Sequence, residues 1–82
     1  MLEKYDEERY GTMSFCYEAP RWANVSGEIK YMARDLGLDV KEIEIQKFLI
    51  REKGYVVLEG YKSVLEEFKY FFKKKIEVYN RS

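Results

Sequence analysis

The amino-acid sequence predicts a small α+β domain in which an antiparallel sheet carries two helices on one face. Two kinds of apolar spacing lead to this prediction. Strict alternation of apolar and polar side chains is typical of a strand with one buried face, whereas apolar residues three to four positions apart are typical of an amphipathic helix. The segments follow in the order strand, helix, strand, strand, helix, and 82 residues suffice for one domain.

The first strand is predicted just after a charged N-terminal segment. Its face toward the core carries Met13, Phe15 and Tyr17. Pro20 ends this strand because proline has no N–H to give to a sheet ladder. Residues 1–10 are predicted to be a loosely held charged arm, so the domain itself is expected over residues 11–82.

The first helix follows a short loop. An apolar stripe at helical spacing predicts it, formed by Val25, Ile29, Met32, Ala33 and Leu36. We expect Asn24 or Ser26 to cap its start, because their side chains accept hydrogen bonds from free backbone N–H groups. Gly37 is expected to end it, because a helix often stops at a glycine in the left-handed conformation.

The second strand is predicted over residues 40–50. Phe48 and Ile50 have the opposite parity to the apolar residues that precede them. This predicts either a bulge near Gln46 and Lys47 or a strand that changes the face it buries.

A turn is expected at residues 51–54, followed by an apolar third strand at residues 55–58, so that the two strands form a hairpin. The second helix has the capping-box pattern Ser63-Val64-Leu65-Glu66 at its start. Its apolar stripe contains Val64, Leu65, Phe68, Phe71 and Phe72. Residues 76–80 form either a short last strand or an extension of this helix.

With right-handed crossovers, this order of elements predicts the ferredoxin-like, split-βαβ arrangement, with its last strand short or missing. The expected core contains Phe15, Ile29, Met32, Leu36, Val57, Leu65, Phe68 and Phe72.

Composition narrows the function classes. Fifteen basic residues balance fifteen acidic ones, which gives no electrostatic argument for a nucleic-acid or membrane partner. No apolar run approaches the ~20 residues that a membrane-spanning helix needs. Without histidine the chain lacks the commonest general base and a favoured zinc ligand, so neither a metal nor a cofactor is predicted.

Cys16 is the only cysteine, so no intrachain disulfide is possible, and the polar N-terminus does not have the pattern of a signal peptide. A cytoplasmic location is therefore expected. A dense and balanced charge is also found in proteins of thermophiles, and a thermophilic source is a further expectation.

Three stretches resemble the acylphosphatase family. Residues 31–38 are similar to the end of the family's first helix, which closes in Leu-Gly-Leu. Residues 54–60 look like its third strand, which ends in Glu-Gly, and residues 64–74 resemble its second helix, which contains Leu-Glu-Glu-Phe. With the first strand included, the resemblance spans about residues 12 to 75. It implies a ferredoxin-like (acylphosphatase-like) sandwich.

The resemblance also implies a phosphate site in a glycine-rich loop after the first strand, where backbone N–H groups and an arginine hold the phosphate. Counted back from Leu36-Gly37-Leu38, that loop corresponds to residues 18–26. The family's three glycines fall on Glu18, Trp22 and Asn24.

The two catalytic side chains implied by the resemblance are also replaced. The arginine falls on Ser26, and the asparagine that orients the attacking water falls near Glu44. We therefore expect a catalytically inactive acylphosphatase-like protein that acts as a small binding or interaction domain. The alternative is an enzyme that acts on a phosphorylated substrate with Arg21 or Lys30 in place of the lost arginine; otherwise these two are ordinary exposed cations.

Candidate binding residues are Arg21, Trp22 and Lys30. Trp22 is expected either to anchor a partner or to pack on the edge of its own core. The expected partner is an unknown protein or a small anion, and an open sheet edge allows a homodimer. An RNA-binding sheet face is not favoured, because Thr12, Ser14 and Cys16 offer no aromatic ring to a base.

Overall fold

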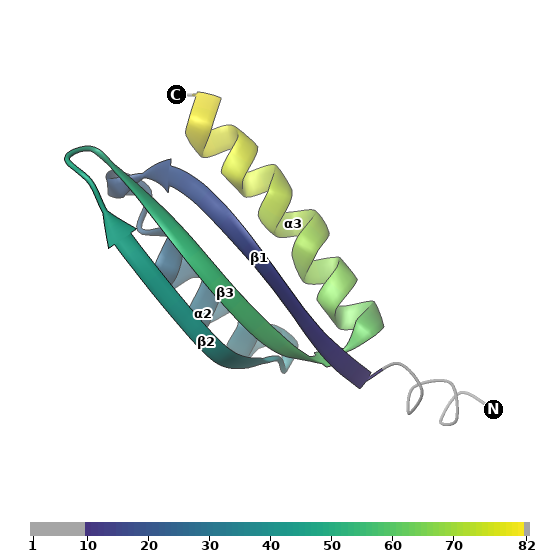
Figure 1. The fold of residues 1–82 in the computed structure, drawn as a ribbon. Helices are drawn as coiled ribbons and strands as arrows, with labels where there is room; N and C mark the ends of the chain where they lie inside the picture. The colour runs from purple at the N-terminus through teal and green to yellow at the C-terminus, as the bar shows by residue number, and fades with distance from the viewer. Residues whose placement is uncertain (1–9, 82) are drawn as a thin grey trace.

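One three-stranded sheet packs against two helices (Figure 1). The computed structural model describes residues 10–81, so the predicted arm lies outside the described residues except for Tyr10, which opens the first strand. The elements are β1 (Tyr10–Pro20), the 3-10 helix η1 (Arg21–Ala23), α2 (Val25–Leu36), β2 (Asp39–Lys47), β3 (Arg51–Tyr61) and α3 (Lys62–Arg81).

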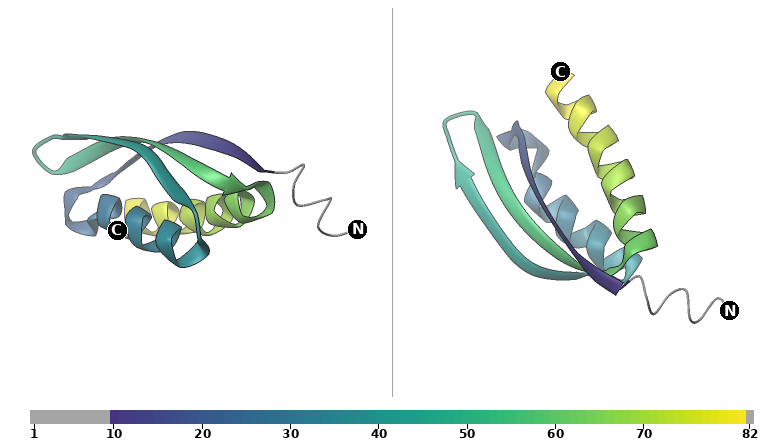
Figure 2. Two further views of the ribbon diagram at one scale, coloured as in Figure 1. Left: turned by 90° about the horizontal axis from the view of Figure 1, so that it is seen from below. Right: turned by 45° about the vertical axis from the view of Figure 1, so that its right-hand side comes forward.

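The strand order in the sheet is β1-β3-β2, and both outer strands run antiparallel to β3. Because β1 and β2 therefore run in the same direction, α2 is the crossover between them. Both helices lie on one side of the sheet (Figure 2). The predicted α+β class, antiparallel sheet and one-sided helices are confirmed, and the arrangement is compatible with a ferredoxin-like fold.

The hairpin between β2 and β3 turns earlier than the sequence predicts. The Phe48 N–H donates to the Arg51 carbonyl over 2.7 Å, so Phe48 and Ile50 belong to the turn and not to a strand. The turn predicted at residues 51–54 is wrong, because these residues begin β3. The bulge predicted near Gln46 is also wrong: the one register shift between these strands lies at the other end of β2, between Val40 and Glu42.

Gly54 explains why that turn prediction failed. It stands opposite Tyr17 in the β1–β3 ladder, and a Cβ atom there would lie 2.1 Å from a ring carbon of Tyr17. The glycine is needed for the close approach of this ring and not for a positive φ. Its chemistry therefore marks the inside of a strand.

The core lies between the sheet and the helices. Of the expected core residues, Ile29, Leu65, Phe68 and Phe72 are buried, and Phe15, Met32 and Leu36 pack against them half-buried. The prediction for Val57 is wrong. Its neighbours Val56 and Leu58 face the helices, so alternation along β3 turns Val57 to the helix-free face of the sheet, called the open face below.

The boundaries of the two helices agree only in part with the predicted ones. α2 follows Asn24, whose φ of 50° is left-handed and whose side chain makes no capping hydrogen bond, and it stops at Gly37 (φ 78°) as predicted. α3 begins at Lys62, one residue before the predicted capping box. The open question at residues 76–80 is decided in favour of the helix, because Ile76 and Tyr79 pack against the core from α3.

Candidate functional site

The segment matched to the phosphate loop, residues 18–26, is spread over several elements. Its first three residues complete β1, the next three form η1, and α2 starts at Val25. The Arg21 N–H donates to the Ile50 carbonyl over 3.0 Å, which continues the pairing of β1 with β3 past Pro20. The chain therefore stays extended or coiled on itself here and forms no glycine loop.

Arg21 is committed to the hairpin. Its guanidinium donates to the carbonyl oxygens of Phe48 (3.2 Å) and Leu49 (3.4 Å) at the tip of the β2–β3 turn. These contacts satisfy two carbonyls that have no ladder partner in a turn. The side chain that the sequence offers as a substitute phosphate ligand thus holds the turn.

The start of α2 is occupied by the chain itself. The Asn24 side chain lies over Gly27, where a Cβ would come within 2.8 Å of its amide nitrogen. Glu28, in the first turn of α2, accepts hydrogen bonds from Lys75 (3.3 Å) and from the Tyr79 hydroxyl. That second bond, and then burial, raises the pKa of Tyr79. A carboxylate is favourable at this helix end, but it takes the place an anionic ligand would need.

The predicted binding residues do not converge. Trp22 is 65% exposed and packs edge-to-face on Tyr79, with ring centroids 5.8 Å apart. Ser26, at the position of the family arginine, is half-buried in the first turn of α2, and Lys30 is exposed further along that helix. Among residues 10–81, Arg21, Trp22 and Lys30 share no hydrogen bond or ring contact that would join them into one site.

Glu44 faces a shallow depression of about 550 Å³ on the open face. Glu18 and Lys53 line the same depression, together with Cys16 and Tyr55. The lining thus carries two carboxylates and one cation, so the depression has no excess of positive charge with which to attract an anion. Among residues 10–81 no cluster of three histidine, cysteine or acidic side chains could hold a metal ion.

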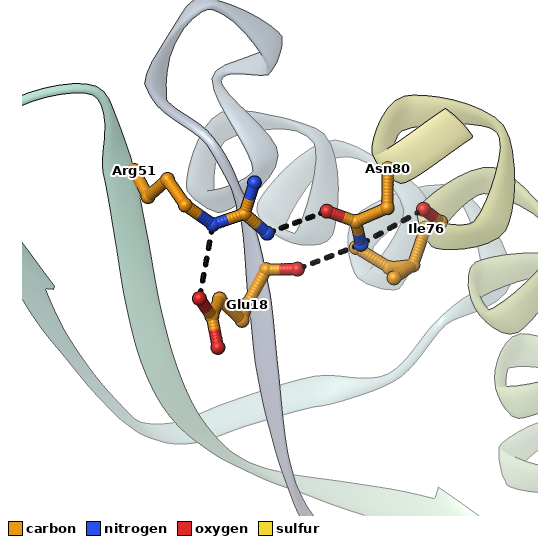
Figure 3. Close-up of polar contacts among 4 residues, drawn as sticks. All are labelled: Glu18, Arg51, Ile76 and Asn80. Carbon is orange, nitrogen blue, oxygen red and sulfur yellow. Dashed lines mark hydrogen bonds and ion pairs between the residues drawn. The ribbon is translucent and has the colours of Figure 1, made fainter. Parts of the chain in front are cut away.

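A polar clamp ties the end of α3 to β1, and sequence reasoning missed it (Figure 3). Arg51 forms an ion pair with Glu18 at 2.9 Å and donates to the side-chain oxygen of Asn80 over 2.6 Å. The Asn80 amide in turn donates to the backbone carbonyl of Glu18 over 3.0 Å. The sequence predicts a turn at residues 51–54 and leaves the last element undecided. It therefore gave no reason to bring these three residues together.

A buried pair lies at the same end of the sheet, on the covered face. Glu52 is 3% exposed and accepts a hydrogen bond from the Tyr17 hydroxyl over 2.8 Å. Burial, and then the bond and charge of Glu52, raise the pKa of Tyr17 well above its usual range. The parity of Glu52 with Val56 and Leu58 is the sequence signal that could have placed it inside.

A groove of about 480 Å³ runs between β1 and α3, called the edge groove below. Its apolar floor consists of Phe15, Phe68, Phe72 and Ile76, and its outer rim carries Lys69 and Lys73. The sequence predicts an open sheet edge but not which strand forms it, nor that α3 turns this edge into a groove.

Fold and site thus define a small α+β protein in which the residues matched to a phosphate loop serve the hairpin and the helix ends. A scan against protein-family models found no match, and searches of the curated proteins and of the solved structures found no similar protein. No helix within residues 10–81 has the length and apolar character that crossing a membrane requires.

Proposed function

We propose that this chain is a non-catalytic binding domain with an acylphosphatase-like, ferredoxin-like fold, located in the cytoplasm. One observation carries the proposal: the guanidinium of Arg21, the one cation within the matched loop of residues 18–26, is held by two carbonyl oxygens of the hairpin turn. Catalysis of phosphoryl chemistry needs a fixed positive charge and several backbone donors around the phosphoryl oxygens.

Further contacts support the same proposal. Glu18 and Glu44 share one depression with Lys53, so this depression offers no excess of positive charge to a phosphate placed over the end of β1. Ser26 has no charge to offer, and the Asn24 side chain covers the first turn of α2. A protein that keeps a folded scaffold without these groups acts by what its surface binds.

The test is a steady-state assay of purified protein with a simple acyl phosphate, such as benzoyl phosphate. We expect no turnover above the uncatalysed rate. Ser26→Arg should not restore activity, because the two carboxylates stay and no backbone cradle forms. Titration with inorganic phosphate, followed by calorimetry, should show no saturable binding.

The alternative, an enzyme that uses Arg21 or Lys30 as its catalytic cation, predicts the opposite result. Hydrolysis at a rate typical of acylphosphatases, abolished by Arg21→Ala or by Lys30→Ala, would overturn the proposal and show that the catalytic charge has moved. Arg34→Ala is the matched control, because Arg34 is an exposed cation of α2 outside the matched loop.

A further inference from the structure

The outer edge of β1 presents backbone groups that the sheet does not use. The Arg21 N–H points to β3, so alternation along the strand directs the odd-numbered residues of β1 to β3 and the even-numbered ones outward. The bond from Asn80 to the Glu18 carbonyl agrees with this parity. Among residues 10–81, no hydrogen bond reaches the backbone N–H and carbonyl groups of Ser14 and Cys16, which point outward. α3 thus caps the outward carbonyl of Glu18, and the outward backbone groups of Ser14 and Cys16 are left without a partner within residues 10–81.

The edge groove lies directly beside these free groups. Its floor is apolar and aromatic: Phe15 packs against Phe68 and Phe72, with ring centroids 5.8 and 5.1 Å apart. Phe15 is only half-buried although it contacts both of these rings. Unpaired strand edge and apolar floor together are the two features that strand-adding sites use: main-chain bonds supply affinity, and alternate side chains enter the groove.

The position of α3 decides what fits there. Figure 1 and the right-hand view of Figure 2 show α3 beyond β1, on the side away from β3. One added strand needs only ~5 Å beside β1, and α3 would cover its inward face. A second copy that pairs through β1 would bring its own α3 to the same place. The space therefore suits a lone extended segment and not a symmetric sheet.

Charge on the rim specifies the segment further. Lys69 and Lys73 lie one helical turn apart, and within residues 10–81 neither has an acidic partner within ion-pair distance. Two acidic side chains line the groove: Glu77 from α3, and Glu18 from β1, which is paired with Arg51. An acidic side chain opposite the two lysines would gain charge complementarity that the free protein lacks.

We propose that the edge groove binds an extended segment of a partner protein, which adds as a fourth strand next to β1 and carries apolar side chains alternating with acidic ones. This inference rests on the proposed function, because it names the class of partner that the binding domain takes. The net charge of zero does not predict this preference, because a net charge does not report where on the surface the charges lie.

The test is selection of random ten-residue peptides displayed on phage against the whole chain. We expect enriched sequences to alternate apolar with other residues and to contain Asp or Glu. Lys69→Glu combined with Lys73→Glu should weaken the enriched peptides about tenfold or more and should select basic residues instead. Arg34→Glu with Lys47→Glu is the matched control: it makes the same charge change at two exposed cations of α2 and β2, away from the groove, and should leave binding unchanged.

A backbone variant tests the strand geometry separately. Ser14→Pro removes an outward N–H and no ladder bond, so it should weaken the peptides while the protein stays folded, as followed by circular dichroism. If this variant does not fold, hydrogen exchange of the wild type decides: added peptide should slow exchange at Ser14 and Cys16 and leave Phe15 and Tyr17, already paired with β3, unchanged.

Three results would overturn the proposal: no enrichment over an unselected library, binding that survives the Lys69 and Lys73 double variant, or binding that protects the hairpin turn instead of β1. A dimer that forms with concentration and slows exchange at Ser14 and Cys16 without peptide would assign the edge to a second copy. Acyl phosphate turnover would refute the proposed function on its own, whatever the peptide result.

Discussion

The two faces of the sheet differ in how far they bury their side chains. On the face covered by the helices, every second residue of β3 from Glu52 to Gly60 is buried. On the open face, Lys53 and Tyr55 of the same strand are exposed. Neighbouring residues of one strand thus experience either a packed interior or solvent. The same chemical change should therefore cost very different amounts on the two faces.

Two carboxylates at one end of the sheet show this difference. Glu52 is 3% exposed with the Tyr17 hydroxyl as its donor, whereas the Glu18 side chain is 49% exposed and pairs with Arg51. In the interior a polar group that loses its partner keeps its full desolvation cost, but at the surface water replaces the partner. The buried bond should matter more, although the exposed ion pair carries more formal charge.

The largest effect is expected at the centre of the covered face. Phe68 is fully buried, and Phe68→Ala should lower the free energy of unfolding by about 3–5 kcal/mol, through lost apolar burial and the cavity left behind. The matched control is Phe71→Ala on the same helix, where the side chain is 46% exposed and the cost should stay below about 1 kcal/mol. Urea denaturation of both variants measures the contrast, and equal losses would contradict it.

The intermediate effect is expected at Tyr17. Tyr17→Phe keeps the ring but removes the donor to buried Glu52, so the free energy of unfolding should fall by about 1–3 kcal/mol. Chemical denaturation at pH 7 measures this. A variant as stable as the wild type would mean that water reaches Glu52.

The pH dependence of the same variant gives an independent check. The pKa of Tyr17 in the folded protein is raised above the usual value near 10, so the unfolded chain loses this proton first. Stability from the Tyr17 hydroxyl is complete below about pH 10 and is lost as the pH rises above it. Tyr17→Phe should therefore lose less stability than the wild type as the pH rises above about 10. Equal slopes for the two proteins would argue against a raised pKa.

The smallest effect is expected on the exposed clamp. Arg51→Ala removes the ion pair with Glu18 and the bond to Asn80, yet exposed pairs contribute only about 1 kcal/mol or less. The loss should shrink further in the presence of about 1 M NaCl, because salt screens exposed charges. Thermal denaturation at low and high salt tests this, and a loss as large as that of Tyr17→Phe would place the clamp with the interior contacts.

Much of this arrangement could be predicted from the sequence, since periodicity reports which side chains share a face. It identified Met13, Phe15 and Tyr17 on the covered face of β1, and it found both helices. It failed where a residue has two physical uses. The sequence predicts a turn at Gly54 because glycine permits positive φ, but in the structure this glycine makes room for a tyrosine ring.

The contacts of the candidate site could not be predicted from the spacing of apolar residues. Arg21 meets the hairpin carbonyls across 27 residues of sequence, and Asn80 meets Glu18 across 62. No local pattern records such pairs, because they depend on how the elements pack. The turn at Leu49 and Ile50 is a second such case: both side chains are apolar, at 90% and 72% exposed, and the turn is held by Arg21 and not by turn-forming residues.

The place of Trp22 has a consequence for spectroscopy. The only tryptophan of the chain lies outside the core and touches Tyr79, in the last turn of α3. Its fluorescence therefore reports whether the end of α3 is docked, whereas ellipticity reports the sheet and helices as a whole. Helix ends open locally at lower free energy than the core. A change in emission that precedes the loss of ellipticity would then be fraying of this helix end and not an intermediate in global unfolding.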